Sequence, residues 1–314
     1  MSTSSKPTAV LAKRVPHSTE FTRRSWLTAA GGVVAAASLN ADGGNLTAQE
    51  PSADWKINKG RIRQSAVRWC FESVPIADLA RGAAALGMQS VELVKPEEWS
   101  VLKERGLICA LSPSHGFVRG LNNKAHHPEC IELLTKAIDA SSAAGFPSVI
   151  TFSGMREGLS DEEGIRNTID GVKQVIGLAE KKRVNICLEP LNTRVNIEMK
   201  GHPGYHCDRV EWAIEVCEKV GSPRMKVLFD IYHTQIMQGD VITRIRQYKD
   251  YIGHYHTAGV PGRNDLDDLQ EINYPAVMQA IAETGYQGYV GQEFIPKGPD
   301  KLAALRHAAR LCDV

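Results

Sequence analysis

The sequence lacks the features that mark several common classes of protein. Its seven cysteines form no Cys-X-X-Cys pair and are odd in number, so neither a zinc knuckle nor a disulfide framework is indicated. The formal net charge is only +1, which gives no electrostatic footprint for nucleic acid or for an anionic membrane. With 314 residues, 43% hydrophobic and 23% charged, the composition is that of a globular protein with one large core.

The first fifty residues differ from the rest, and they lack an apolar run long enough for a comfortable transmembrane helix. Arg23 and Arg24 precede a short segment rich in alanine and glycine, which resembles a twin-arginine export signal, with cleavage after Ala48 as one option. The alternative is a disordered tail with a chance arginine pair. We predict a leader and linker over residues 1–50 and a catalytic domain over 51–314. Export would place the protein in the periplasm or envelope, and an unused leader would leave it in the cytoplasm.

From about residue 60 the chain alternates between short apolar runs and segments with helical spacing. The apolar runs predict eight strands, at residues 64–71, 90–94, 107–114, 148–154, 185–191, 225–233, 252–259 and 289–296. Helices are expected at residues 75–87, 96–106, 128–145, 161–183, 208–221, 240–251, 274–285 and 300–312. Eight such units in about 250 residues predict an α/β protein with a closed (β/α)8 TIM barrel. An open doubly wound sheet is the alternative, but WCFESVP after the first strand lacks the glycine-rich phosphate turn of that fold.

Four predicted strands carry, at or near their ends, side chains of the types that bind metal ions: Glu189, Asp230, His256 and Glu293. In a parallel barrel the carboxyl ends of the strands share one face, so we expect these side chains to form one site. Three carboxylates and one imidazole suit a divalent ion such as Mg²⁺, Mn²⁺ or Co²⁺. Taken singly, each residue has an ordinary alternative, a salt bridge for a carboxylate or a satisfied core position for the histidine.

Other polar residues near the strand ends are candidates for substrate contact. His233 is placed to reach a substrate oxygen or to orient a ligand, a helix-capping or packing role being the alternative. Arg263 suits a substrate carboxylate or hydroxyl, or it is a solvated loop charge. His115 and Trp69 are expected to line the pocket, with core packing as the alternative for Trp69. His254 is expected to face away from the seventh-strand ligand and to be structural.

The stretches LEPLN, FDIYHTQIMQGD, IGHYHTAGVPGRN and EINYPAVMQAIAETGYQGYVGQEFIPKG together resemble the hydroxypyruvate isomerase family. That family belongs to the xylose isomerase-like TIM barrels and has the ketose 3-epimerases as close relatives. The resemblance covers most of residues 62–312 and is sharpest from Leu188 onward. It implies that Glu189, Asp230, His256 and Glu293 bind the divalent metal. It also implies that the two glutamates transfer protons.

By the same resemblance, His233 and Arg263 match positions that contact the substrate in the epimerases. The activity it implies is an isomerase, an intramolecular oxidoreductase of the aldose–ketose type, that interconverts hydroxypyruvate and tartronate semialdehyde through an enediolate. Some hydroxypyruvate isomerases carry glutamine where this chain has His256, whereas the epimerases carry histidine. A ketose 3-epimerase or another sugar isomerase on the same site is therefore the alternative.

Two other classes of protein fit the sequence less well. A metal-dependent abasic-site endonuclease on the same barrel would use a richer histidine cluster, but the second strand, in SVELVKPEEW, has no histidine and no basic stripe is present. A carbohydrate-binding barrel without activity would not need paired glutamates. The expected partner is a small hydroxycarbonyl or sugar substrate, with no nucleic acid and no stable membrane insertion after leader removal. A homo-oligomer is compatible with the sequence.

Overall fold

The computed structural model describes Met1 and residues 54–314, so the predicted leader lies outside the described residues apart from Met1. In the described part, seven strands pair in parallel in the order β2-β1-β7-β6-β5-β4-β3. They are β1 (Arg63–Val67), β2 (Ser90–Glu92), β3 (Ser148–Thr151), β4 (Asn185–Leu188), β5 (Met225–Asp230), β6 (Ile252–Thr257) and β7 (Tyr289–Gln292). Each lies within a run for which the sequence predicts a strand, or begins one residue before it.

The predicted third strand, residues 107–114, is not a regular strand, but it joins the two edges of the sheet. Ile108 forms a parallel bridge with Ser90 of β2, and Ser112 forms one with Val149 of β3. The backbone N–H of Ser112 also donates to the carbonyl of Ser148 at 2.9 Å. The segment changes partner between its two ends, so it makes isolated bridges and no continuous ladder. It closes the sheet, and the barrel predicted from the sequence is confirmed.

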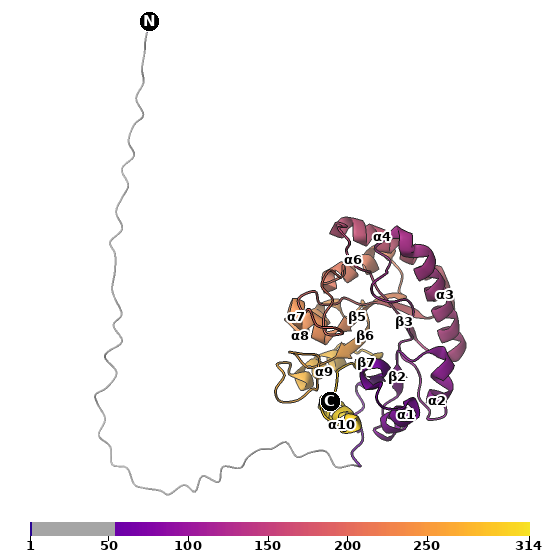
Figure 1. Cartoon of the computed structure of the whole chain (residues 1–314), viewed down its shortest axis with the longest axis vertical. Coiled ribbons are helices and arrows are strands. Elements are labelled where there is room, and N and C mark those ends of the chain that lie inside the picture. The colour runs from indigo at the N-terminus through magenta and orange to yellow at the C-terminus, as the bar shows by residue number, and fades with distance from the viewer. Residues whose placement is uncertain (2–53) are drawn as a thin grey trace. The chain divides into compact units, whose positions relative to one another are not determined.

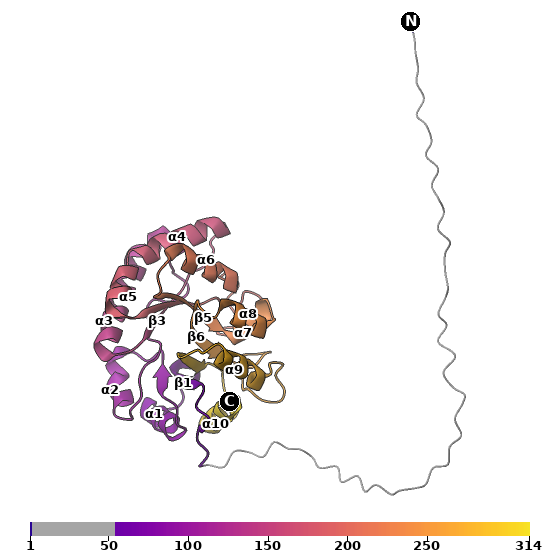
Figure 2. The same cartoon turned by 180° about the vertical axis from the view of Figure 1, so that it is seen from behind.

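The helices surround the strands, as Figures 1 and 2 show from opposite sides. They are α1 (Ile76–Ala85), α2 (Trp99–Lys103), α3 (His127–Ala144), α4 (Asp161–Lys173), α5 (Ile176–Lys182), α6 (Val210–Val220), α7 (Ile231–Met237), α8 (Val241–Tyr248), α9 (Tyr274–Glu283) and α10 (Lys301–Leu311). Three short 3₁₀ turns accompany them, η1 (Arg68–Phe71), η2 (Pro96–Glu98) and η3 (Lys124–His126). Among the described residues, no helix is both long and apolar enough to cross a membrane.

Local sequence signals explain where several helices begin and end. The Ser160 side chain accepts from the backbone N–H of Glu163 at the start of α4, and Asp300 does the same for α10. Helix α3 ends at Gly145, whose φ of 78° is a left-handed conformation that glycine adopts without strain. The long helix predicted over residues 161–183 is divided into α4 and α5, because Gln174 and Val175 make tighter bonds to carbonyls three residues back.

The buried apolar side chains form one large cluster and one small cluster. The small cluster contains Leu111 of the 107–114 segment and one residue each from β3, β4 and β5, namely Ile150, Cys187 and Leu228. The next residue, Phe229, belongs instead to the large cluster between strands and helices, because successive strand side chains point to opposite faces. All seven cysteines are free and buried, as small buried thiols.

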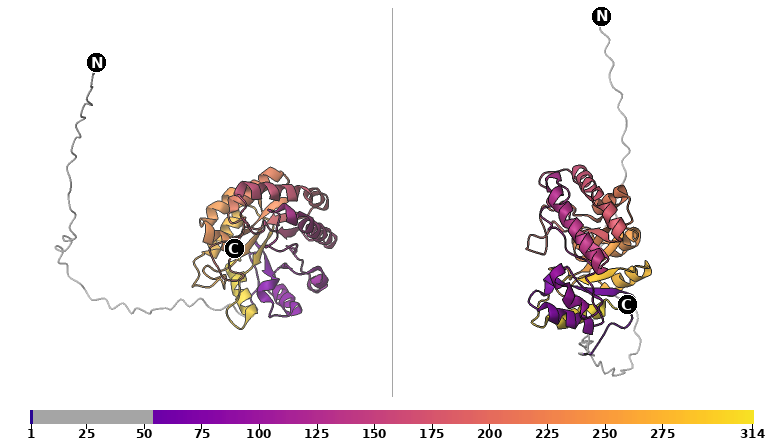
Figure 3. Two further views of the ribbon diagram at one scale, coloured as in Figure 1. Left: turned by 45° about the horizontal axis from the view of Figure 1, so that its top comes forward. Right: turned by 90° about the vertical axis from the view of Figure 1, so that its right-hand side faces the viewer.

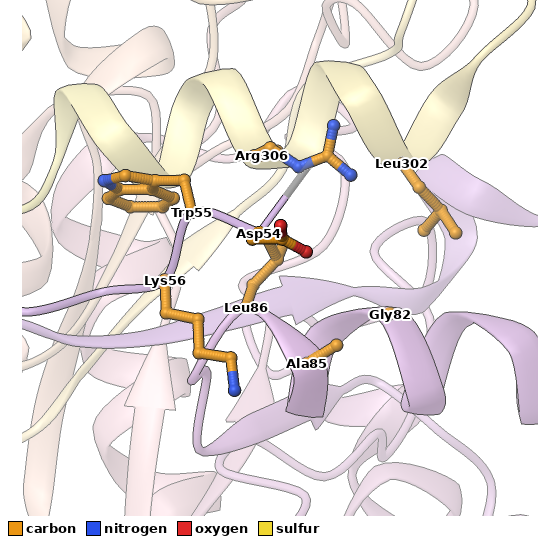
Figure 4. Close-up of a pocket in the computed structure, with 8 residues that line it drawn as sticks. All are labelled: Asp54, Trp55, Lys56, Gly82, Ala85, Leu86, Leu302 and Arg306. Atoms are coloured by element: carbon orange, nitrogen blue, oxygen red, sulfur yellow. The ribbon is translucent and has the colours of Figure 1, made fainter. Parts of the chain in front are cut away.

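The described start of the barrel domain is tied to its end. Figure 4 shows Asp54, Trp55 and Lys56 beside helices α1 and α10, around a cavity of about 460 Å³. Farther along, the Asp313 carboxylate accepts from the backbone N–H groups of Asn58 at 3.0 Å, and of residues 59 and 60 at 3.1 Å. Figure 3 shows this terminal region beside α10, at the edge of the barrel.

Candidate active site

The structure brings together the four residues for which the sequence predicts metal binding. Asp230 ends β5 and His256 lies in β6, while Glu189 and Glu293 directly follow β4 and β7. One ligand atom of each lies within 4.8 Å of the others. All four side chains are buried, at the carboxyl ends of adjacent strands. This is the arrangement expected from a parallel barrel, because all of its strands run in the same direction and their carboxyl ends therefore lie on one face.

The His256 ring is oriented by carboxylates on both of its nitrogen atoms. Its Nε2 lies 2.7 Å from Glu92 Oε1, and its Nδ1 lies 2.8 Å from Glu293 Oε2 and 3.6 Å from Glu189 Oε1. Within residues 54–314, neither Nδ1 of His256 nor Oε1 of Glu189 has a well-directed hydrogen bond, although both atoms are buried. Burial would lower the pKa of His256, but Glu293 and Glu189 raise it well above its ordinary value. His256 and Glu189 are both among the residues that could hold a metal ion.

The carboxylates of the described site carry more negative charge than its own cations offset. Burial raises the pKa of Asp230 to about 8 although Arg263 opposes this, and burial also raises the pKa of Glu189. Burial would raise the pKa of Glu293 too, but Arg263 and His256 hold it well below its ordinary value. Arg263 and His256 therefore offset the negative charge of Glu293 better than that of Asp230 or Glu189. The donor set and its excess negative charge fit a hard or borderline divalent cation.

Arg263 is part of this site and is not a solvated loop charge. Its guanidinium Nη2 lies 2.5 Å from Glu293 Oε2 and 3.4 Å from Asp230 Oδ2, and its Nη1 donates to the Met199 carbonyl at 2.7 Å. The guanidinium carbon lies 5.0 Å from the centre of the Trp69 ring. The indole N–H of Trp69 donates to Glu293 at 2.9 Å, so Trp69 also borders the site.

His233 lies in the first turn of α7 and not in a strand. The run predicted as the strand 225–233 ends at Asp230, because this carboxylate accepts from the backbone N–H of His233 at 3.1 Å and caps the helix. His233 Nδ1 accepts from the backbone N–H of Asn192 at 3.0 Å, which leaves the proton on Nε2. That buried Nε2 has no hydrogen-bond partner in the part of the chain that the structure describes, and it lies 3.5 Å from Asp230 Oδ2.

His115 lies outside the four-residue cluster, although it is buried. Its Nε2 lies 2.8 Å from the hydroxyl oxygen of Thr151, and its Nδ1 lies 3.0 Å from the Gly116 carbonyl oxygen. Burial lowers the pKa of His115, so the neutral ring is favoured. Both ring nitrogens therefore have protein partners, and the role of His115 in lining the pocket stays a prediction.

The prediction that His254 faces away from His256 was wrong, and Glu92 was missed. Residues two apart on a strand share a face, so His254 and His256 point the same way, with ring centres 5.1 Å apart. Both Nε2 atoms lie within 2.8 Å of the same Glu92 oxygen. Burial would raise the pKa of Glu92, but His254 and His256 lower it to about 2. The available signal was a glutamate in the otherwise apolar strand of SVELV.

The structure is a closed parallel barrel with acidic and histidine side chains gathered at the carboxyl ends of its strands. A family model described as xylose isomerase-like TIM barrel matches residues 81–313, and the chain belongs to that family. The chain is 28% identical over 237 residues to a putative hydroxypyruvate isomerase of Homo sapiens, covering 74% of this chain and 79% of that protein. It is 27% identical over 237 residues to a 2-oxo-tetronate isomerase of Cupriavidus necator, covering 70% and 87%.

Solved structures share the barrel. A protein described as AP endonuclease, family 2, from Brucella melitensis has a TM-score of 0.66 and 25% identity, covering 76% of this chain and 95% of that chain. An L-ribulose 3-epimerase has a TM-score of 0.64, covering 79% and 92%, and at 17% identity this likeness shows the fold alone. Together with the named relatives, the family supports an isomerase, as the sequence predicts.

Proposed function

We propose that this protein is a metal-assisted isomerase that interconverts hydroxypyruvate and tartronate semialdehyde. The observation that carries this proposal is the placement of Glu189 and Glu293 at 3.6 and 2.8 Å from the same atom, His256 Nδ1, in a buried site that also contains Asp230. A pair of carboxylates over one small space can remove a proton from one carbon and return a proton to the next. The resemblance of LEPLN and GQEFIPKG to hydroxypyruvate isomerases supports the same roles.

The metal ligands in this proposal are Glu189, Asp230, His256 and Glu293. A bound Mg²⁺, Mn²⁺ or Co²⁺ would supply Lewis-acid stabilisation for oxygen atoms that become negative during the reaction. Hydrogen bonds from the chain support the donor set. Glu92 accepts from the far nitrogen of His256, and the main chain of α7 donates to Asp230.

The proton chemistry is assigned to the two glutamates. One removes a proton from C3 of hydroxypyruvate, which gives an enediolate, and the other delivers a proton to C2. The hydroxyl proton on O3 is lost as that carbon becomes the aldehyde, and O2 gains one, so the atoms balance. The His233 Nε2–H is a buried donor that finds no acceptor among the described residues, so we assign it to a substrate oxygen. Arg263 holds Glu293 in place and offers charge to the substrate carboxylate.

A ketose 3-epimerase on the same site is the second candidate. The observation that favours it is the histidine at position 256, which the epimerases share. An abasic-site endonuclease is less favoured, because the described cluster of Glu189, Asp230 and Glu293 includes only one histidine, His256. Such an enzyme would need several histidines for its zinc ions.

A substrate screen tests the proposal directly. The purified protein is assayed with hydroxypyruvate, 2-oxo-tetronate, psicose, tagatose and fructose, each with Mn²⁺ and with chelator. We expect turnover of hydroxypyruvate with Mn²⁺ only, and a higher melting temperature with Mn²⁺ because a cation that binds only the folded barrel stabilises it. Turnover of a ketose but not of hydroxypyruvate would mean that the ketose is the substrate. If activity and melting temperature were the same with chelator as with Mn²⁺, the metal site would be contradicted.

We also propose that residues 1–50 form an export leader. Changing Arg23→Lys together with Arg24→Lys should keep the protein in the cytoplasm with these residues uncleaved, because the arginine pair is the feature the export route reads. Cell fractionation followed by mass spectrometry of the N-terminus measures both effects. A double variant that is exported and cleaved like the unchanged protein would show that the segment is not a twin-arginine leader.

A further inference from the structure

Glu92 is a fully buried carboxylate to which the proposed reaction gives no direct role. It ends β2, and its Oε1 lies 2.8 Å from His254 Nε2 and 2.7 Å from His256 Nε2. A glutamate on the second strand thus reaches two histidines on β6, across the inside of the barrel. Its other oxygen, Oε2, has no hydrogen-bond partner among the described residues.

The contacts of Glu92 with the two histidines have the geometry of hydrogen bonds, although the same three residues could also hold a metal ion. The nitrogen–oxygen separations at Glu92 are 2.7 and 2.8 Å, the ordinary length of a charge-assisted hydrogen bond. Because a carboxylate only accepts, the Nε2 atoms of His254 and His256 both donate to it.

The barrel makes room for Glu92 at a single glycine. A Cβ atom on Gly291 would lie 2.4 Å from Glu92 Oε1 and 2.8 Å from His256 Cδ2, closer than packed atoms approach. Gly291 is the register partner of His256 in the neighbouring strand β7. A strand glycine at a point of close approach is what allows the carboxylate to reach the ring.

We propose that Glu92 is a positioning residue for the metal ligand His256. By accepting from Nε2–H, Glu92 turns the ring so that Nδ1, and not Nε2, faces Glu189 and Glu293. His254 donates to the same oxygen and holds the carboxylate in place. The proposal rests on the metal site proposed above, and loss of a group that is hydrogen-bonded to a metal-binding histidine typically weakens metal binding about 10–100-fold.

Two replacements of Glu92 show whether its effect comes from accepting hydrogen bonds or only from its volume. Glu92→Leu keeps an approximate volume but removes the acceptor, whereas Glu92→Gln keeps one oxygen that can accept. Calorimetric titration with Mn²⁺ should show affinity about 10–100-fold weaker for the leucine variant and substantial recovery in the glutamine variant. One Mn²⁺ per chain is expected in the unchanged protein. Two would favour a second metal at Glu92 and overturn the proposal, as would unchanged affinity in Glu92→Leu.

Gln64→Leu is the matched control. Gln64 is as buried as Glu92 and lies on the adjacent strand β1, but its amide nitrogen donates to the Ala309 carbonyl on α10 and its amide oxygen accepts from Gln292, so it contacts none of the proposed metal ligands. We expect this variant to lose stability without losing Mn²⁺ affinity. Equal losses of affinity in Gln64→Leu and Glu92→Leu would mean that general destabilisation explains the effect, which would overturn the positioning role. Circular dichroism and denaturant unfolding check that each variant folds.

A second readout needs neither metal nor activity. In the metal-free protein, NMR should show two slowly exchanging imidazole Nε2–H protons, one from His254 and one from His256, with His254→Gln used for assignment. Both should be retained in Glu92→Gln and lost in Glu92→Leu, and their persistence in Glu92→Leu would overturn the proposal. The unchanged protein could bind no Mn²⁺ and still show both signals, with their loss in Glu92→Leu. That result would contradict the metal-dependent function but support the hydrogen bonds of Glu92.

Discussion

Glu293→Gln should lower turnover by roughly 10²–10⁴, the usual cost of losing a positioned acid or base. Glutamine keeps the size of the side chain and one oxygen, so one of the two groups that donate to Glu293, Trp69 at Oε1 or Arg263 at Oε2, retains its acceptor. What it removes is the ability to take up a proton. Metal should still bind, more weakly, and Glu189→Gln should behave in the same way.

Hydrogen exchange at the substrate carbon is the sharpest measurement of this effect. With Mg²⁺ at saturation in deuterated water, NMR should show exchange of the carbon-bound hydrogen by the unchanged protein and its loss in both glutamine variants. Glu97→Gln, an exposed glutamate before α2, is the matched control and should exchange normally. A Glu189→Gln or Glu293→Gln variant that binds metal and turns over at the unchanged rate would exclude that glutamate from the proton transfer.

Asp230→Asn should act chiefly on metal binding. We expect metal affinity to fall by more than the roughly 10–100-fold that loss of a group hydrogen-bonded to a ligand costs, because Asp230 is proposed as a ligand itself. The fold should survive, since asparagine also caps helices well and can accept from the His233 N–H. Calorimetric titration with Mn²⁺ and activity as a function of metal concentration measure the effect.

Excess metal separates the two kinds of variant. It should restore part of the activity of Asp230→Asn, because the proton-transferring glutamates are intact, and it should restore little in Glu293→Gln. If added metal rescued Glu293→Gln fully and left Asp230→Asn inactive, the roles assigned to Asp230 and Glu293 would have to be exchanged. A melting curve with chelator for each variant shows whether the metal-free fold is equally stable.

The sequence alone determined the architecture and the membership of the metal-type cluster. Apolar runs alternating with helical segments are a local pattern, and eight of them close into a barrel whose strand ends share a face. Glu189, Asp230, His256 and Glu293 could therefore be grouped without coordinates, because each lies at or near the end of its own run. The structure places their ligand atoms within 4.8 Å of one another.

Local pattern was insufficient where the backbone changes course. IYH after Asp230 continues the apolar run of β5, so it resembles a strand, but the Asp230 carboxylate caps α7 at that point. Residues 107–114 have the composition of a strand, yet they divide their bonds between β2 and β3. Both outcomes depend on where neighbouring backbone lies, which a run of apolar residues does not specify.

Only the tertiary structure decided how the site residues are held. Glu92 lies 162 positions before His254 and 164 before His256, and barrel closure is what brings it to both rings. Asn192 similarly sets the tautomer of His233 from a loop 41 positions away. Such contacts depend on strand order and register across the whole barrel, because a hydrogen bond requires its two atoms to lie within about 3 Å. Residue type and spacing along the chain do not carry that information.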